Sequence, residues 1–297
     1  MVSRRKVLLG GAGVAVGALA GGFAAVELGR VPGRVEPGEA LGRCAGPAPP
    51  PDGPGPEVRS ALLPSRFRGR DVPWALALPP GAPTAGLPVV LVLHGRGGTA
   101  RSAFDELGLH HVLARHVAGG GRPFALASAD GDIAYWHPRA SGDDPLGMLV
   151  HEVLPALGAL GLAADRIGAW GWSMGGYGAL LLARESERGA LGGVRVAAAA
   201  AASPALFASP AATGQGSFDG PADFARWGDL LADPGVSTTP LRVACGDNDA
   251  FTEATRRYRD AVHPTPAGGI TPGCHDNGYW AAEAVAALAF LADHLGR

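Results

Sequence analysis

The chain has 297 residues, of which 18% are charged, and its formal net charge at pH 7 is −2. This balance excludes the basic surface of a nucleic-acid-binding protein and the polybasic patch of a protein that binds acidic membranes. Glycine and proline are abundant, with 47 and 26 residues, but 47% of the residues are apolar, which favours a packed core over a disordered chain. The composition therefore predicts one large domain whose partner is a small or neutral molecule.

The N-terminal residues have the pattern of an export signal. Arg4 and Arg5 begin a short basic cluster, after which no charged residue occurs until Glu27. Arginine pairs before a weakly apolar segment are typical of the twin-arginine route, so we expect residues 1–30 to be this signal, with cleavage near Ala20. Retention of the segment as a membrane anchor is the alternative. Cleavage leaves a secreted or cell-envelope protein with no stable membrane insertion.

The rest of the chain divides into a linker and one domain. Residues 31–58 are rich in proline and glycine and have too few apolar residues to order themselves, which predicts a linker before a folded domain at 59–297. In this domain, apolar runs bounded by Gly or Pro alternate with longer helix-like segments. Such runs are typical of strands buried on both faces of a parallel sheet, so the predicted class is α/β. The runs cover residues 87–93, 123–128, 166–170, 194–202 and 240–245.

One of these runs conflicts with local propensity. Residues 197–202 are all alanine, and alanine favours a helix. Their place in the alternation nevertheless predicts a strand.

A candidate nucleophile follows the third apolar run. The segment Gly171-Trp172-Ser173-Met174-Gly175 has the form G-x-S-x-G, and an apparent helix begins directly after it. A strand, a sharp turn and a helix lift a serine hydroxyl out of the backbone at the end of a sheet, and glycines on both sides leave room for the strained turn. We therefore predict Ser173 as the nucleophile. The backbone N–H of Met174, at the helix start, is predicted to bind a developing oxyanion.

A second oxyanion donor has to come from another loop. The first apolar run ends in His94-Gly95-Arg96-Gly97-Gly98, where glycines let bare backbone approach a ligand at the same edge of the sheet. We assign the second donor to the N–H of Arg96, with that of Gly97 as the neighbouring alternative.

These motifs, together with Gly246-Asp247-Asn248-Asp249 and Gly273-Cys274-His275-Asp276, resemble the putative-esterase branch of the α/β-hydrolase superfamily, from about residue 87 to the C-terminus. That branch includes esterase D-like thioesterases, secreted feruloyl and acetylxylan esterases, and cell-wall mycolyl transferases. The resemblance implies the α/β-hydrolase fold, with a mostly parallel central sheet and helices on both faces. It also implies that the catalytic serine, acid and histidine follow one another in this order along the chain.

This order leaves three histidines as candidate bases. His263 lies in a Pro-rich turn and His294 in the terminal helix, whereas His275 lies in a loop before a helix, as in the family, and is predicted as the base. Related esterases carry Gly-x-x-Asp after the preceding strand, which selects Asp249 as the acid and leaves Asp247 as a turn or capping residue. The Gly and Glu of a calcium loop do not follow, so no metal or other cofactor is expected.

Aromatic residues near the predicted strand ends have two interpretations. Tyr135, Trp136 and Trp280 either line a substrate pocket or pack in the core. Residues 203–234 leave the alternation and predict a short insertion over the site. A long amphipathic lid is not evident, which favours a short acyl group or a soluble glycan ester over bulk lipid as substrate.

The predicted function is a secreted serine esterase that hydrolyses small-molecule or glycan esters through an acyl-enzyme, with a Ser173, Asp249 and His275 triad. An acyltransferase of the cell envelope, in which an alcohol replaces water at the second step, is one alternative. A non-catalytic exported binding protein on the same fold is another, although the presence of all three catalytic residue types argues against it.

The three cysteines lack the paired spacings of a zinc site. In the fold that the resemblance implies, Cys245 and Cys274 lie at the ends of neighbouring strands, so we expect a disulfide between them and an unpaired Cys44 in the linker. Two reduced, buried residues are the alternative, because twin-arginine substrates fold before export in a reducing compartment.

Overall fold

The computed structural model describes residue 44, residues 55–232 and residues 234–296. The expected signal at 1–30 and most of the expected linker at 31–58 lie outside these residues. The first strand begins at Val58, one residue before the expected start of the domain. No helix in the described ranges combines the length and apolar character that a membrane span requires.

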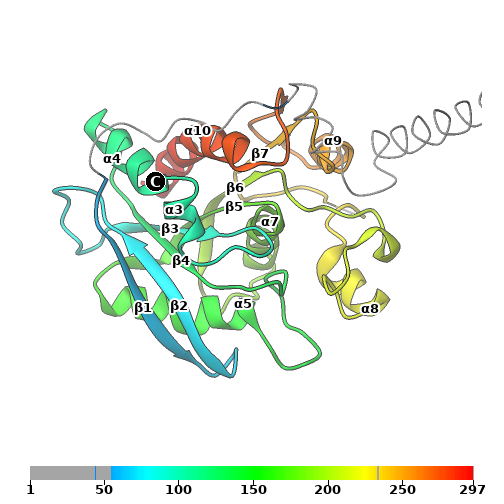
Figure 1. Cartoon of the computed structure of the whole chain (residues 1–297), viewed down its shortest axis with the longest axis horizontal. Helices are drawn as coiled ribbons and strands as arrows, with labels where there is room; N and C mark the ends of the chain where they lie inside the picture. The colour runs from blue at the N-terminus through cyan, green and yellow to red at the C-terminus, as the bar shows by residue number, and fades with distance from the viewer. Residues whose placement is uncertain (1–43, 45–54, 233, 297) are drawn as a thin grey trace, which may run out of the picture.

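An eight-stranded sheet forms the centre of the molecule, with the strand order β1-β2-β4-β3-β5-β6-β7-β8 (Figure 1). Its strands are β1 (Val58–Ser65), β2 (Arg70–Ala77), β3 (Pro88–Leu93), β4 (Ala125–Ala129), β5 (Ala163–Trp172), β6 (Arg195–Ala202), β7 (Leu241–Gly246) and β8 (Ile270–Thr271). The six strands from β4 to β8 in this order run parallel to one another, which confirms the predicted mostly parallel sheet. All five predicted apolar runs form strands.

The antiparallel edge of this sheet was not predicted from the sequence. β1 and β2 form a hairpin, and β2 pairs with β4 in the antiparallel direction. Most of β1 is exposed, so its residues do not show the continuous apolar run by which the buried strands were recognised.

Helices cover both faces of the sheet, as predicted. They are α3 (Ser102–Asp105), α4 (Leu109–Ala118), α5 (Pro145–Met148), α6 (Leu154–Ala159), α7 (Met174–Glu187), α8 (Pro221–Asp223), α9 (Thr252–Ala261) and α10 (Asn277–Leu295), with π-helical turns at Leu149–Val153 and Phe224–Gly228 and a 3-10 turn at Pro210–Ala212. Val89, Leu91 and Leu93 of β3 pack in one core with α5, α6 and α7. Val90 and Val92, which point to the opposite face, pack in a second core with α3, α4 and α10.

The alanine run is a strand, as its place in the alternation predicted. In β6, every residue after Arg195 is buried, because the strand lies between β5 and β7 and is covered by α7 and α10. Burial from all sides outweighs the helix propensity of alanine, and the small side chains let both helices approach the sheet closely.

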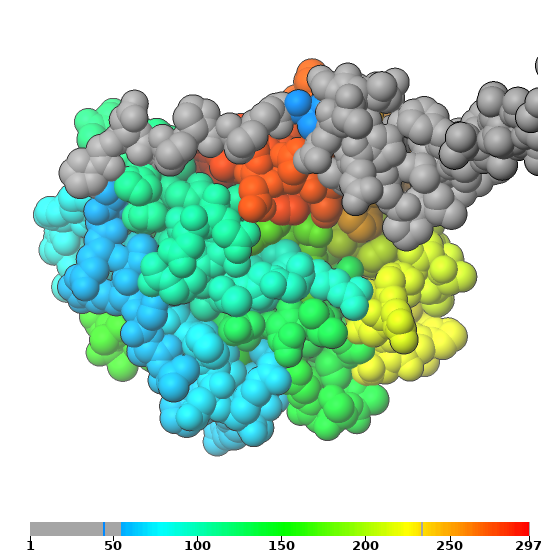
Figure 2. Space-filling model, viewed as in Figure 1, coloured from blue at the N-terminus to red at the C-terminus, as the bar shows by residue number. Residues whose placement is uncertain are grey.

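The short insertion between β6 and β7 packs beside α7 (Figure 1). Its core is aromatic, with Phe218 in ring contact with Tyr135, Tyr177 and Phe224. In the space-filling view, the insertion (yellow) adjoins the segment after β3 (teal), where the Arg96 guanidinium donates a hydrogen bond of 2.7 Å to the carbonyl oxygen of Gln215 (Figure 2). The insertion therefore lies next to the loop in which the second oxyanion donor is predicted.

Candidate active site

Three strands bring the predicted triad residues together. Ser173 directly follows β5, Asp249 lies in the turn after β7, and His275 lies between β8 and α10. Because these strands are parallel, their carboxyl ends meet at one edge of the sheet, although 102 positions of sequence separate Ser173 from His275.

The serine occupies a strained turn. Its backbone angles, φ 53° and ψ −120°, are rarely adopted by a residue with a side chain. The turn brings Gly175 against the carbonyl oxygen of Leu93, and Gly171 against the carbonyl oxygen of Gly175, so closely that a Cβ atom at either glycine would collide with backbone. The structure thus gives the physical reason for the G-x-S-x-G spacing.

The histidine bridges the other two residues. Its Nδ1 lies 2.8 Å from Asp249 Oδ2, and its Nε2 lies 2.9 Å from Ser173 Oγ. Asp249 is fully buried, and its other oxygen accepts a hydrogen bond of 2.8 Å from the N–H of Phe251. All three groups are satisfied when Nδ1–H donates to the carboxylate and Nε2 accepts from the serine hydroxyl. That tautomer is the one in which the imidazole can remove the proton of Ser173.

Two rings flank this histidine. The indole of Trp280 meets the imidazole edge-on, with the ring centres 4.9 Å apart, and the ring of Phe251 lies 5.3 Å away in a tilted arrangement. The imidazole is therefore held by packing as well as by its hydrogen bonds.

The residues considered as alternatives to Asp249 and His275 have other contacts. Asp247 Oδ1 accepts a hydrogen bond of 3.1 Å from the N–H of Gly273, so this carboxylate fastens the loop that carries His275. His263 is exposed, and the Nδ1–H of His294 donates to the carbonyl oxygen of Phe290 at 2.8 Å. Neither of these two histidines contacts Ser173 or Asp249.

The glycine loop lies directly against the nucleophile turn. A Cβ atom on Gly95 would lie 3.4 Å from Ser173 Cβ and 2.8 Å from Trp172 Nε1, so only glycine fits there. A hydrogen bond of 3.0 Å from the N–H of Gly98 to the carbonyl oxygen of Gly95 closes the loop into a turn that contains Arg96. Met174 is the first residue of α7, at the other side of Ser173. The roles of Arg96 and Met174 as oxyanion donors remain predictions.

Buried His94 fixes the start of this loop. Its Nδ1–H donates to the carbonyl oxygen of Gly95 at 2.7 Å, and its Nε2 accepts from the N–H of Gly131 at 2.9 Å. These two bonds define a neutral tautomer that ties the loop after β3 to the loop after β4. This role of His94, a residue of the glycine-rich motif, was not predicted from the sequence.

A cleft of about 390 Å³ opens at Ser173 and His275. The Gly95 to Gly98 loop forms one wall, and Trp280 lines the cleft, so its role in a substrate pocket stays a prediction. Tyr135 and Trp136 do not line it. Their exposed fractions are 4% and 0%, and both lie in the core, in agreement with the other interpretation.

Three further residues of the cleft were not singled out from the sequence. They are Glu106, Trp172 and Asn277. Glu106 accepts hydrogen bonds from Ser102 Oγ at 2.6 Å and from Asn277 Nδ2 at 3.2 Å, which fix a carboxylate at the rim. The positions of Trp172 and Asn277, next to Ser173 and close to His275, were a signal that could have identified them. Glu106 carries no such signal, because helix α3 reaches the site only through the tertiary fold.

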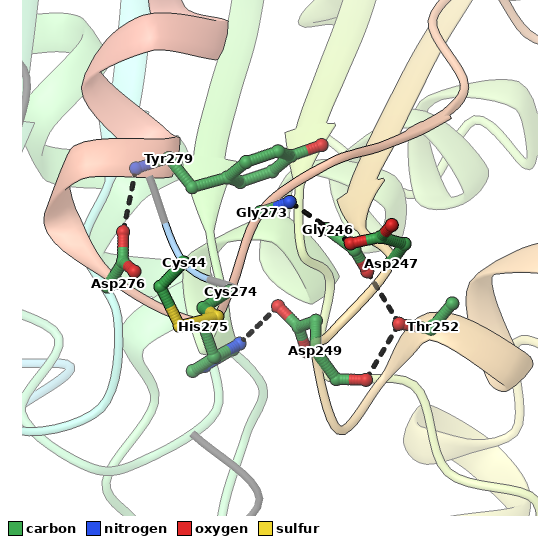
Figure 3. Close-up of a disulfide and its surroundings, with 10 residues drawn as sticks. All are labelled: Cys44, Gly246, Asp247, Asp249, Thr252, Gly273, Cys274, His275, Asp276 and Tyr279. Carbon is green, nitrogen blue, oxygen red and sulfur yellow. Dashed lines mark hydrogen bonds and ion pairs between the residues drawn. A yellow bond between two sulfur atoms is a disulfide. The ribbon is translucent and has the colours of Figure 1, made fainter. Parts of the chain in front are cut away.

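The predicted disulfide is wrong. Cys274 is bonded to Cys44, with the two Cα atoms 5.1 Å apart (Figure 3). Cys245 is a free, buried thiol. Cys245 lies within β7, fully shielded by its neighbours, and burial raises the pKa of its thiol, which therefore stays protonated. The place of Cys245 and Cys274 on neighbouring strands did not decide the pairing, because Cys44, from the expected linker, lies against the histidine loop.

Comparison with known proteins agrees with this geometry. Residues 65–291 match the family described as "Putative esterase". The curated protein "Putative esterase NocK" from Nocardia uniformis subsp. tsuyamanensis is 32% identical over 169 residues. That match covers 48% of this chain and 48% of the relative, so the chain spans about half the length of the curated relative that it matches.

Solved structures share the fold. A ferulic acid esterase has a TM-score of 0.65 at 20% identity, over 80% of this chain and 97% of that chain. An S-formylglutathione hydrolase from Agrobacterium tumefaciens has a TM-score of 0.67 at 16% identity, over 82% of this chain and 96% of that chain. These likenesses establish the α/β-hydrolase fold, and the family match extends over most of the folded domain. The chain therefore belongs to the Putative esterase family of serine hydrolases.

Proposed function

We propose that this protein is an exported serine esterase that cleaves small carboxylic esters through an acyl-enzyme intermediate. The observation that carries the proposal is the hydrogen-bonded line from Ser173 through His275 to buried Asp249, with distances of 2.9 and 2.8 Å, at the base of an open cleft. A serine hydroxyl becomes a strong nucleophile when a correctly oriented imidazole takes its proton.

In the first half of the reaction, Ser173 Oγ attacks the ester carbonyl while His275 Nε2 takes the hydroxyl proton. Asp249 keeps Nδ1–H directed at its carboxylate and stabilises the imidazolium that forms. The backbone N–H groups of Arg96 and Met174 hold the oxyanion, and His275 then gives its proton to the departing alcohol. In the second half, His275 activates a water molecule that releases the acid and frees Ser173.

The dimensions and chemistry of the cleft favour a small substrate. A cleft of about 390 Å³ accommodates a small acyl or alcohol group rather than a long lipid chain. The indoles of Trp172 and Trp280 offer an apolar surface, and the Glu106 carboxylate offers a hydrogen-bond acceptor at the rim. This combination suits a short acyl ester of a hydroxylated alcohol, such as a soluble glycan.

The disulfide supports export. Disulfides persist in extracellular and periplasmic compartments and are rare in a reducing cytoplasm, and Cys44 and Cys274 are bonded here. N-terminal sequencing of the protein recovered outside the cytoplasm tests this part of the proposal. We expect a new N-terminus close to Ala20. Intact Met1 in a membrane fraction would instead assign the protein to the anchored class.

The catalytic proposal is tested by Ser173→Ala. We expect turnover of p-nitrophenyl acetate to fall by about 10⁴-fold or more, and labelling by a fluorophosphonate probe to disappear. Ser141→Ala, at an exposed serine outside the cleft, is the matched control and should behave like the wild type. Near wild-type turnover by Ser173→Ala would refute the assignment. Product analysis with an added alcohol separates hydrolysis, which releases the free acid, from acyl transfer.

A further inference from the structure

The disulfide between Cys44 and Cys274 is attached directly to the candidate catalytic loop. Cys274 is fully buried and immediately precedes His275, whereas Cys44 lies 230 positions earlier in the chain and is only half-buried (Figure 3). The bond therefore joins the segment before the domain to the residue next to the base. No other covalent link within the described residues holds this loop.

Hydrogen bonds of the backbone and of Asp276 hold the loop on both sides of this position. Gly273 donates to Asp247 Oδ1 at 3.1 Å and accepts from the N–H of Asn248 at 2.9 Å. Asp276 caps α10 by accepting from the N–H of Tyr279 at 2.8 Å. Within the described part of the chain, the backbone N–H and C=O groups of Cys274 and His275 make no hydrogen bond. Among the described residues, the disulfide is therefore the covalent restraint at the Cys274–His275 step, in addition to the burial of Cys274 and the side-chain contacts of His275.

The position of this step determines the geometry of the imidazole. His275 has to keep Nδ1 at 2.8 Å from Asp249 and Nε2 at 2.9 Å from Ser173 at the same time. A displacement of its Cα by about 1 Å breaks one of the two contacts, and misplacement of this size costs about 10²-fold in rate. Packing of the ring against Trp280 and Phe251 limits its rotation but does not fix the backbone that carries it.

We infer that the Cys44–Cys274 disulfide positions His275, so that the esterase reaches full activity only when this bond is formed. The inference rests on the proposed function of the Ser173, His275 and Asp249 site. Cys44 and Cys274 are positioning residues: neither lines the cleft at Ser173, and both act through the loop that carries the base.

The bond can be opened by a small dithiol. A thiolate of dithiothreitol attacks the half-buried Cys44 sulfur and displaces the Cys274 sulfur, and the second thiol of dithiothreitol then releases Cys44. The products are two cysteine thiols and the cyclic disulfide of dithiothreitol, so two electrons and two protons pass from the reagent to the protein. Oxidised glutathione reverses the step through a mixed disulfide and is reduced to two molecules of glutathione.

The experiment compares the exported wild type with Cys44→Ser and with Cys245→Ser, which removes the thiol that takes no part in the bond. For each protein, kcat and KM for p-nitrophenyl acetate are measured before treatment with dithiothreitol, after it, and after reoxidation. Circular dichroism of the same samples reports the fold. Proton NMR reports the far-downfield resonance of the Nδ1–H that lies between His275 and Asp249, which a purely structural role of the bond would leave unchanged.

We expect reduction of the wild type to lower kcat about tenfold or more, with KM changed less than about twofold and with full recovery on reoxidation. Cys44→Ser should match the reduced wild type, lose the downfield resonance and not respond to dithiothreitol, whereas Cys245→Ser should behave like the wild type. Wild-type kcat in Cys44→Ser would overturn the inference and leave the esterase proposal intact. A loss of kcat that occurs only together with unfolding would also overturn it. Absence of both turnover and fluorophosphonate labelling in the oxidised wild type would overturn the proposed function and the inference together.

Discussion

The carboxylate of Asp249 lies 2.8 Å from Nδ1 of His275, whereas that of Asp247, two residues earlier, accepts a hydrogen bond of 3.1 Å from the backbone of Gly273. The two carboxylates therefore have different tasks. Asp249→Asn should lower kcat by about 10⁴-fold, because an amide at this place favours the wrong tautomer of the imidazole. Asp247→Asn should lower kcat by less than about tenfold, because its amide oxygen can still accept from Gly273.

Steady-state kinetics of the two variants on p-nitrophenyl acetate check this ranking, with circular dichroism to verify the fold. The opposite order would transfer the acid role to Asp247.

A substitution at Gly175 tests the close contact between the turn at Ser173 and the carbonyl group of Leu93. Gly175→Ala should destabilise the protein by more than about 4 kcal/mol or prevent folding, because the new Cβ would meet the carbonyl group of Leu93, which is backbone and cannot move aside. Gly158→Ala is the matched control: this glycine lies in α6, is exposed and has no atom within 4 Å of the added Cβ. It should stabilise the protein by about 0.5 kcal/mol through helix propensity. Urea unfolding measures both, and equal effects would contradict the packing argument.

We expect acid to destabilise the insertion by protonating the carboxylate of Asp219. Hydrogen bonds from Arg139 and from the N–H of Ala140 lower the pKa of Asp219 from 3.8 to about 2. Because the pKa is lower in the folded state, the ion pair contributes stability above pH 3.8 and loses it as the pH falls through 2. Exposure to solvent limits this contribution to about 1 kcal/mol, or about 3 °C in Tm.

Asp219→Asn should therefore have a lower Tm than the wild type at pH 6, and the difference should vanish near pH 2. Asp71→Asn, at an exposed position outside the insertion, is measured beside it as the surface control. A Tm difference for Asp219→Asn that is the same at both pH values would contradict this account.

Glu185, in helix α7, links this helix to the insertion through Arg226. Its side chain is 1% exposed and contacts Arg184, Arg188 and Arg226, each at 3.0 Å. Burial acts to raise the pKa of Glu185, but the hydrogen bond from Arg226 and the neighbouring positive charges outweigh it and lower the pKa. Glu185→Gln should cost about 2 kcal/mol, because it removes the counter-charge of the mostly buried Arg184 and weakens the hydrogen bonds to Arg226.

Removal of one exposed partner is the comparison for this buried carboxylate. Arg188→Ala should cost about 1 kcal/mol or less, since its side chain is 54% exposed and Glu185 retains two arginines. Urea unfolding at neutral pH measures the two variants. Equal losses of stability would show that the buried carboxylate contributes no more to stability than one exposed arginine.

The parts of the fold that the sequence predicted are those in which local pattern and burial agree. The central strands read as apolar runs because both of their faces are covered, and the Ser173 turn could be recognised because glycines are sterically required around it. The β1 and β2 hairpin escaped notice because an exposed edge strand carries a mixed pattern.

The misses at the site concern contacts between distant segments. Glu106, at the end of α3, lines the cleft and accepts a hydrogen bond from Asn277, 171 positions away. No local feature of the sequence around either residue predicts this contact. The pairing of Cys44 with Cys274 was not predicted for the same reason. A Pro- and Gly-rich composition indicates whether a segment folds by itself, but not whether a disulfide fixes one of its residues elsewhere in the fold.

The 230 positions between Cys44 and Cys274 also impose an order on biosynthesis. The ribosome makes Cys44 before any strand of the sheet and Cys274 only after β8, so all eight strands have to be synthesised before the bond can close. A truncated product that ends before β8 therefore carries Cys44 without its partner, whatever the oxidant around it. A chain in which thiol titration finds this bond closed has therefore been synthesised beyond β8.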